Sequence, residues 1–155
     1  MNTTKRDLEM RLKYREDPGD DAGAEKNRKA VMDALDAVAE GDMESFWSLF
    51  DQDVVFHEAA CLPYGGAHTG REATMRAHNR LAGMYSKMRN EIEAVLAARD
   101  IVVLYQTITF TVRSNGNTGS MPIAEMLRFR SGKVVEWRAL YFDSNMVANA
   151  LAGAR

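Results

Sequence analysis

The period of the apolar residues changes near Asn90, and this change limits the fold more than any other feature. From there on, apolar residues alternate with polar ones, which is the period of a half-buried strand. Ser114–Gly119 and Ser131–Gly132 are rich in turn-forming residues, and a further turn is expected at Ala97–Asp100. The second half of the chain therefore predicts an antiparallel meander, with strands at residues 90–96, 101–113, 121–130 and 133–143.

The first half of the chain has the period of helices. In Asn27–Glu40 apolar residues recur at i, i+4 and i+7, and Gly41 ends this helix. Asp42 caps a second, short helix, and a third helix runs from Gly70 to about Ser86. Helices followed by a meander favour an α+β domain, in which three helices from the N-terminal half pack on one curved, mostly antiparallel sheet.

Size and charge exclude several classes of protein. The 155 residues suit one domain, and 20 Lys and Arg against 22 Asp and Glu leave no basic field for nucleic acid or a membrane surface. No apolar run approaches the roughly 18–20 residues that cross a bilayer. Cys61 is the only cysteine, so an internal disulfide is excluded and a cytoplasmic location is expected.

We expect residues 1–24 to be a flexible or loosely packed leader, because they carry few apolar residues and many charges. Leu8 and Leu12 allow a short amphipathic helix at Lys5–Tyr14, before the breaker Asp17–Asp21. Residues 25–155 are then expected to form a single domain.

The strand that begins at Val54 ends in two ionisable residues, His57 and Glu58. It then opens into a loop rich in proline and glycine. Such a position is a common way to hold a carboxylate over a pocket. Because side chains alternate along a strand, Val54, Phe56 and Glu58 are expected to face inward and His57 to point away.

Five segments carry a resemblance to a known family: Ala39–Asp42, Asp51–Glu58, Leu62–Gly66, Gly70–Ala73 and Ser131–Arg138. In this order and spacing they resemble the nuclear transport factor 2-like (NTF2-like) superfamily, in particular its SnoaL-like polyketide cyclase and ketosteroid isomerase-like branch. The resemblance implies a cone-shaped α+β barrel with a hydrophobic pocket for an apolar small molecule. It also implies a homodimer, and neither a metal nor an organic cofactor.

The resemblance further implies two catalytic carboxyl groups. Glu58 falls where ketosteroid isomerases place their general-base aspartate, and Glu125 falls where they place a protonated carboxyl that donates to the oxyanion. The first-helix tyrosine of those isomerases would fall at Ala34, so the usual oxyanion partner is missing, which counts against a steroid isomerase. Tyr141 on the last strand is the candidate that would provide this hydroxyl instead.

Strand alternation supports an inward Glu125, because it shares a face with Ile123, Leu127 and Phe129. Burial among apolar side chains raises the pKa of a carboxyl. Glu125 is therefore expected to keep its proton to higher pH than Glu58, which should lie beside water and act as the base. The alternatives are that Glu125 pairs with an arginine at a dimer interface and that Glu58 caps the backbone of its loop.

The strands predicted at residues 133–143 and 101–113 supply further candidates. Trp137 and Tyr141 share one row of the last strand with Val135, Ala139 and Asp143, and they suit either a pocket wall or the core. Gln106 shares its face with Leu104, Ile108 and Phe110, so it is a candidate for the polar anchor of the pocket.

The histidines are open to more than one interpretation. His57 has the pKa range for acid–base chemistry near pH 7, or it simply bonds at the sheet rim. His68 lies in the loop before the third helix and is placed to cover the mouth of the pocket, whereas His78 is expected on the helix surface. The full set of candidates for substrate binding is Phe56, Tyr64, His68, Gln106, Trp137 and Asp143.

Two functions fit these features. The first is a small cofactor-independent enzyme that acts on an apolar carbonyl compound by carboxylate general acid–base catalysis, as a cyclase, isomerase or dehydratase. The second is a non-catalytic small-ligand-binding or dimerisation module of the same fold. An epoxide hydrolase is disfavoured, because no Asp-Arg-Asp arrangement is found on these strands.

Overall fold

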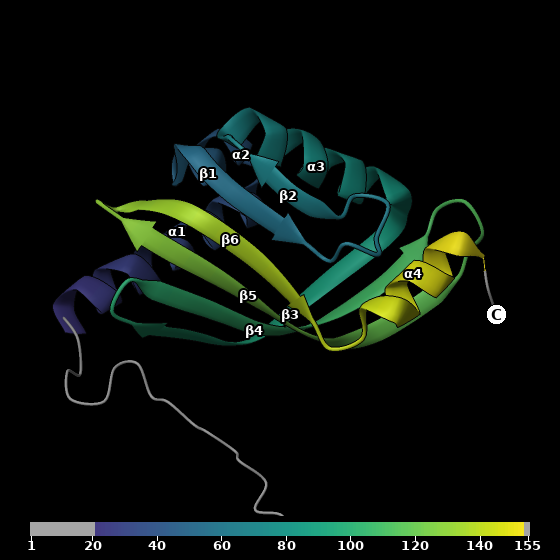
Figure 1. Cartoon of the computed structure of the whole chain (residues 1–155). Coiled ribbons are helices and arrows are strands. Elements are labelled where there is room, and N and C mark those ends of the chain that lie inside the picture. Colours follow the sequence, from purple (N-terminus) through teal and green to yellow (C-terminus); the bar gives the residue numbers. More distant parts are fainter. Residues whose placement is uncertain (1–20, 154–155) are drawn as a thin grey trace, which may run out of the picture.

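The structure is a computed structural model that describes residues 21–153. It is an α+β fold, which confirms the predicted class (Figure 1). Its helices are α1 (Asp21–Glu40), α2 (Met43–Ser48), α3 (Arg71–Met84) and α4 (Ser144–Ala152). Its strands are β1 (Phe50–Glu58), β2 (Gly66–Thr69), β3 (Tyr85–Ala98), β4 (Ile101–Val112), β5 (Thr118–Arg130) and β6 (Lys133–Tyr141).

The strands form one curved sheet in the order β2-β1-β6-β5-β4-β3, which is not closed into a complete barrel. The predicted meander of β3 to β6 is antiparallel throughout. β1 joins this meander by pairing with β6 in parallel, while β2 pairs with β1 in antiparallel fashion. The strand that carries Glu58 therefore lies beside the last strand, although some 75 residues separate them in sequence.

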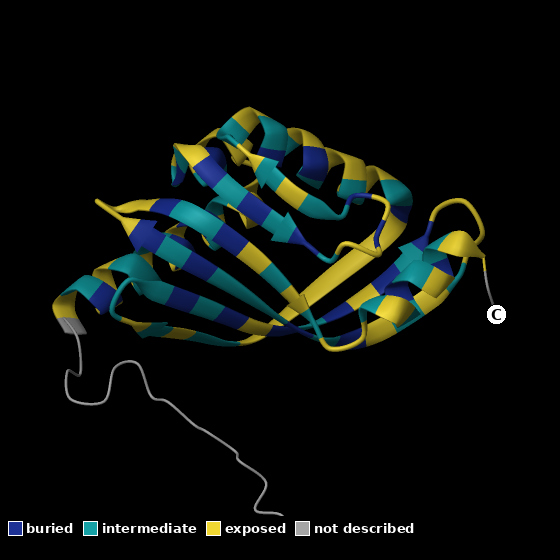
Figure 2. Ribbon diagram, in the orientation of Figure 1, coloured by how far each residue is buried: buried dark blue, intermediate teal, exposed yellow. Residues whose placement is uncertain are grey.

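The helices cover one face of this sheet, which we call the inner face. α1 packs on β3 and β4, α2 packs on α1 and β1, and α3 crosses β1 and β2. α4 packs on β5 and covers the far end of the same face, where Val147 and Ala150 meet Ile108 and Phe110. Burial accordingly alternates along β4 (Figure 2).

The predicted elements differ from the observed ones at their ends. α1 begins at Asp21 rather than Asn27 and buries Ala24. The rest of the expected leader, including the helix predicted at Lys5–Tyr14, lies outside the described residues. β1 already begins at Phe50, and β2 replaces part of the expected loop. Both corrections have one cause, since edge pairing with β6 and β1 makes strands of segments that are polar or short on their own.

α4 was not predicted at all. Asp143 was assigned to the last strand, but its carboxylate accepts a hydrogen bond from the Met146 backbone N–H at 3.0 Å and caps this helix. No helix within residues 21–153 is long and apolar enough to span a membrane.

Candidate functional site

A cavity of about 460 Å³ lies between α1, α2 and the inner face of the sheet. Its walls are mostly apolar, and Ala34 contributes to them at the position where a tyrosine would stand in ketosteroid isomerases. Among the described lining residues, four carry strongly polar side chains: His78, Asn90, Gln106 and Glu125. A cavity with apolar walls and a few convergent polar groups has the character of a small-molecule site.

Glu125 on β5 is the acidic group of this cavity. One carboxylate oxygen accepts a hydrogen bond from Gln106 Nε2 and the other accepts one from Trp137 Nε1, both at 3.0 Å. Both donors come from neighbouring strands of the same sheet, and Gln106 is only 2 % exposed. The side chain is therefore held in one orientation. Within the described chain, no ion pair joins it to an arginine.

Burial raises the pKa of Glu125 to about 6, and the two hydrogen bonds oppose this rise because they stabilise the ionised form. The expected apolar neighbours are present, since Ile123, Leu127 and Phe129 are all buried on the same face. At pH 7 the group is mostly a carboxylate, with a pKa close enough to neutrality for proton transfer.

Aromatic rings form the floor around this carboxylate. The Trp137 ring lies 4.3 Å from Phe56 and 5.4 Å from Phe50, measured between centroids. Phe56 is buried behind Trp137 and does not line the cavity, so the indole and not the phenyl ring meets the contents of the cavity.

Glu58 faces inward at the end of β1, as strand alternation predicts, but it is buried and only 8 % exposed. It does not line the cavity. Burial raises its pKa to about 8. Hydrogen bonds with the Tyr141 hydroxyl and the Ala59 backbone lower the pKa, but by less than burial raises it. One oxygen, Oε2, is enclosed without any hydrogen-bond partner. The expectation of an ionised Glu58 beside water is therefore wrong, and the expected order of the two carboxyl pKa values is reversed.

Three tyrosines surround Glu58. The hydroxyls of Tyr64 and Tyr85 lie 2.8 Å apart, and Tyr141 bonds with both Tyr64 and Glu58. Burial raises the pKa of all three phenols, so they remain neutral hydrogen-bonding groups. Tyr141 was expected to supply a hydroxyl to the cavity, but it does not line the cavity and instead bonds to Glu58. Tyr85 was missed, because its strand was predicted to begin five residues later.

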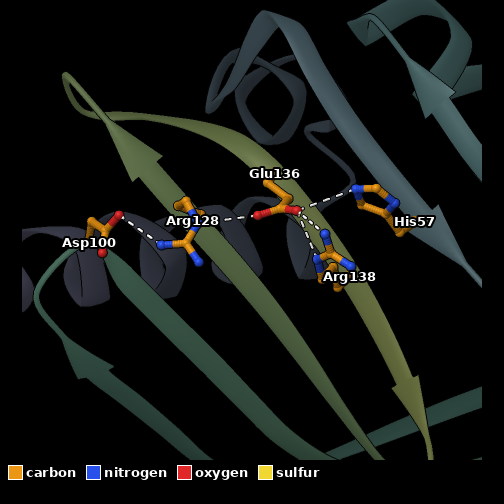
Figure 3. Close-up of polar contacts among 5 residues, drawn as sticks. All are labelled: His57, Asp100, Arg128, Glu136 and Arg138. Carbon is orange, nitrogen blue, oxygen red and sulfur yellow. Dashed lines mark hydrogen bonds and ion pairs between the residues drawn. The ribbon is translucent and has the colours of Figure 1, made fainter. Parts of the chain in front are cut away.

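His57 lies on the opposite, outer face of the sheet (Figure 3). Its Nε2 is 3.4 Å from Glu136 Oε1, which also accepts a hydrogen bond from Arg138. Arg128 links Glu136 to Asp100 in the same chain of charges. Alternation along β1 points the ring away from both Glu58 and the cavity, so the contacts of His57 are those of the other interpretation, a residue that bonds at the rim of the sheet.

Two other candidates have structural partners instead of a place in the cavity. His68 bonds through Nε2 to the Tyr64 carbonyl at 2.9 Å and packs against Phe56, so it holds the loop before α3. Asp143 caps α4, as described above. Of the six substrate-binding candidates, Gln106 and Trp137 line the cavity, while Phe56, Tyr64, His68 and Asp143 do not.

His78 on α3 was expected on the surface, but it lines the cavity. Its ring lies among Phe46, Trp47 and Trp137, with centroid distances of 6.4, 5.5 and 6.1 Å. The spacing of small residues in the sequence is a signal for this position. Thr74 lies four residues before His78 and Ala77 lies one residue before it, and both are buried in the structure. A helical face drawn through these two small residues includes His78.

No three side chains of His, Cys, Asp or Glu gather closely enough in residues 21–153 to hold a metal ion.

The sequence profile of the SnoaL-like domain family matches residues 31–137. No curated protein has a sequence that matches this chain. An NTF2-like protein from Burkholderia thailandensis superposes with a TM-score of 0.74 at 21% identity, covering 81% of this chain and 96% of the other. A protein from Jannaschia sp., provisionally named a SnoaL-like polyketide cyclase, gives 0.73 at 17% identity, covering 88% and 98%.

A third structure, from Catenulispora acidiphila, has a ketosteroid isomerase-like fold and was solved with trimethylamine. It gives a TM-score of 0.59 at 21% identity and covers 72% of this chain and 82% of the other. At these identities the three structures establish the fold alone. Together with the profile, which spans most of the domain from α1 to β6, they assign the protein: it belongs to the SnoaL-like domain family and has the NTF2-like fold.

Proposed function

We propose that this protein is a small enzyme that moves a proton next to the carbonyl group of an apolar compound, with Glu125 as the general base. The observation that carries the proposal is a single carboxylate fixed by two N–H donors inside an apolar cavity. Isomerisation, cyclisation and dehydration of carbonyl compounds all begin with this step. The cyclase and isomerase names among the related structures are compatible with it.

The chemistry follows from the state of Glu125. The ionised carboxylate takes a proton from the carbon next to the carbonyl, and the electron pair of the broken C–H bond moves onto the carbonyl oxygen as an enolate. Where the substrate has a second double bond conjugated with this enolate, the protonated Glu125 then returns the proton to the far carbon of the dienolate, which completes an isomerisation without any co-reactant. Gln106 and Trp137 are positioning residues, because they hold the carboxylate and keep its pKa below the value that burial alone would give.

Glu58 has a different part in this proposal. Its pKa of about 8 keeps it protonated at pH 7, and the charge of Glu125 contributes to this rise. A neutral acid close to the base leaves a single negative charge in the interior, and so Glu58 does not compete with Glu125 for the proton of the substrate. The resemblance to ketosteroid isomerases would assign the base to Glu58, but its burial and its absence from the cavity lining favour Glu125.

Hydrogen exchange on a model ketone tests this proposal. The α-hydrogens of 2-tetralone, a flat apolar ketone, are followed by NMR in D₂O with wild-type protein and with Glu125→Gln, Glu58→Gln and Glu91→Gln. We expect saturable exchange that rises with pH through about 6 to a plateau, in line with the pKa of Glu125. Glu125→Gln should lower the rate by about 100-fold or more. Glu91, an exposed carboxyl on β3, provides the matched control and should have no effect.

Three results would contradict the proposal. An unchanged rate in Glu125→Gln would remove the assigned base. Loss of exchange in Glu58→Gln, with Glu125→Gln active, would return the base to the position implied by the resemblance. Saturable binding of 2-tetralone without exchange would make the cavity a non-catalytic ligand-binding site, which is the second function that the sequence left open.

A further inference from the structure

We infer that His78 donates a hydrogen bond from Nε2 to an oxygen of the bound molecule, so that the cavity selects apolar compounds with a carbonyl oxygen. This inference rests on the cavity being the substrate site proposed above. It adds a second polar contact to the cavity that holds the base, and it assigns the role of the missing oxyanion donor to His78.

The surroundings of the imidazole fix its orientation. Rings of Phe46, Trp47 and Trp137 lie around it, and Trp47 meets it edge to face at 84°. α3 holds the backbone of His78, so the ring has little room to turn. No hydrogen bond or ion pair to another described residue engages either nitrogen.

The two ring nitrogens have different environments. Nδ1 is enclosed by protein atoms and has no hydrogen-bond partner, whereas Nε2 is not among the enclosed atoms. Because a buried N–H without an acceptor is rarer in proteins than an unpaired acceptor, the single proton of a neutral ring belongs on Nε2. The N–H that results belongs to a side chain that lines the cavity.

The ring is neutral at physiological pH. Burial lowers the pKa of His78, and no carboxylate contacts the ring to oppose this effect. Glu125 is the one acidic side chain among the described lining residues, and both of its oxygens are already engaged by Gln106 and Trp137. A neutral imidazole can polarise a carbonyl without giving up its proton. It can therefore stabilise the negative oxygen of an enolate by a hydrogen bond.

The position relative to Glu125 suits the proposed reaction. Trp137 donates to Glu125 through Nε1, and its ring lies 6.1 Å from the ring of His78. A small ketone against this indole can therefore reach both groups, with its oxygen toward His78 and its α-carbon toward the carboxylate. While Glu125 removes the proton, the developing negative charge on oxygen is stabilised by the Nε2–H, and His78 keeps its own proton throughout.

Binding measurements separate this inference from the proposed catalysis. Calorimetry compares 2-tetralone with tetralin, which has the same two rings but no oxygen. We expect wild type to bind the ketone roughly three- to tenfold tighter than the hydrocarbon, the value of one neutral hydrogen bond. His78→Phe should abolish this preference, while Glu125→Gln should keep it although exchange is lost. His78→Gln, which retains an N–H donor, should restore part of it.

A spectroscopic measurement needs no ligand. In protein labelled with ¹⁵N-histidine, long-range proton–nitrogen correlations distinguish a proton on Nε2 from one on Nδ1, and His78→Phe identifies the signal by its loss. A neutral ring with the proton on Nε2 at pH 7 is expected. A proton on Nδ1, a charged ring, or an equal ketone preference in His78→Phe would each overturn the inference. If wild type shows the preference but no exchange, the proposed catalysis fails while the role of His78 stands.

Discussion

Glu58 and Glu125 have the same side chain and the same inward orientation, yet their environments give them opposite protonation states at pH 7. The difference lies in the donors that reach them. Two N–H groups bind the two oxygens of Glu125, while one oxygen of Glu58 has no partner and the other meets Tyr141, whose hydroxyl can also accept a hydrogen bond. The two N–H donors stabilise the ionised form of Glu125 and lower its pKa, whereas at Glu58 the effect of burial outweighs its hydrogen bonds by more and the pKa stays higher.

Glu58 should make the stability of the fold depend on pH. Its pKa is about 8 in the folded state and near 4.5 when unfolded, so its favourable contribution is complete below pH 4.5 and is lost as the pH rises toward 8. Over this range wild type should lose on the order of a few kcal/mol. Glu58→Gln should be much less sensitive, keeping the smaller slope that Glu125 causes between about pH 4.5 and 6 and the opposing slope that the lowered pKa of His78 causes below about pH 6.5.

Urea unfolding at pH 5, 7 and 8.5 measures this difference. Glu91→Gln, an exposed change of the same kind, should follow the wild-type curve. If wild type and Glu58→Gln lose stability in parallel with rising pH, then Glu58 is not a protonated buried acid and the contrast between the two carboxyls is wrong.

For single residues, the sequence predicted which way the side chains point but not which residues they form hydrogen bonds with. Alternation along the strands placed Glu58, Gln106 and Glu125 inward, and all three face inward in the structure. The partners depend on which residues oppose one another in the sheet. Gln106 and Trp137 flank Glu125 because of the registers of β4, β5 and β6, and a single sequence does not contain these registers.

Irregularities in the strands explain the errors made at the level of elements. In β6, Glu136 pairs with Arg128 but Val134 pairs with Phe129, so Val135 is an extra residue at a bulge. Val134 is buried here, whereas strict alternation placed Val135 in the row of Trp137. Bulges of this kind change which face a side chain occupies, and alternation alone cannot reveal them.

The end of β6 supplies a test at the same scale. Asp143 lies two residues after the strand and caps α4, which buries Val147 and Ala150 against the sheet. Asp143→Ala removes the acceptor for the Met146 N–H and should destabilise the protein by about 1 kcal/mol. Asp143→Asn keeps an acceptor oxygen and should cost much less.

Denaturant unfolding measures the loss of stability in both variants. The exchange of α-hydrogens tests separately whether Asp143 contributes to the cavity. Because Asp143 lies outside the cavity, exchange per folded molecule should remain at the wild-type level in both variants. A loss of exchange in a fully folded Asp143→Ala would restore the binding role that the sequence suggested for this residue.

For the whole molecule, the class of fold was predictable and the order of the strands was not. Periodicity and turn residues gave the helices and the antiparallel meander. The parallel pairing of β1 with β6 joins distant parts of the chain, and neither periodicity nor turn residues contain it. This pairing brings Glu58 beside the last strand, and so the arrangement of the candidate site depends on the least local contact in the fold.

The outer face of the sheet is covered by none of the described helices and carries two kinds of residue. Rows that cross β4, β5 and β6 bring Tyr105 beside Ala124 and Ala124 beside Leu140. Leu140 is 54 % exposed, and Phe142 just after the strand is 82 % exposed. The charged chain from His57 to Asp100 occupies the neighbouring rows (Figure 3). An apolar patch beside a charged one is typical of a surface that meets a partner.

The resemblance implies a homodimer, and we predict that its two copies pair through this outer face. Light scattering at micromolar concentration should give twice the mass of one 17.3 kDa chain. Leu140→Arg places a charge in the apolar part of the face and should shift the protein toward monomer, because an unpaired charge buried at an interface costs several kcal/mol. Met32→Arg, an equally drastic change of an exposed apolar residue on α1, lies on the opposite side of the sheet and should leave the mass unchanged. A wild-type monomer would contradict the prediction directly. A dimer that survives Leu140→Arg but dissociates in Met32→Arg would move the interface to the helical side, beside the cavity.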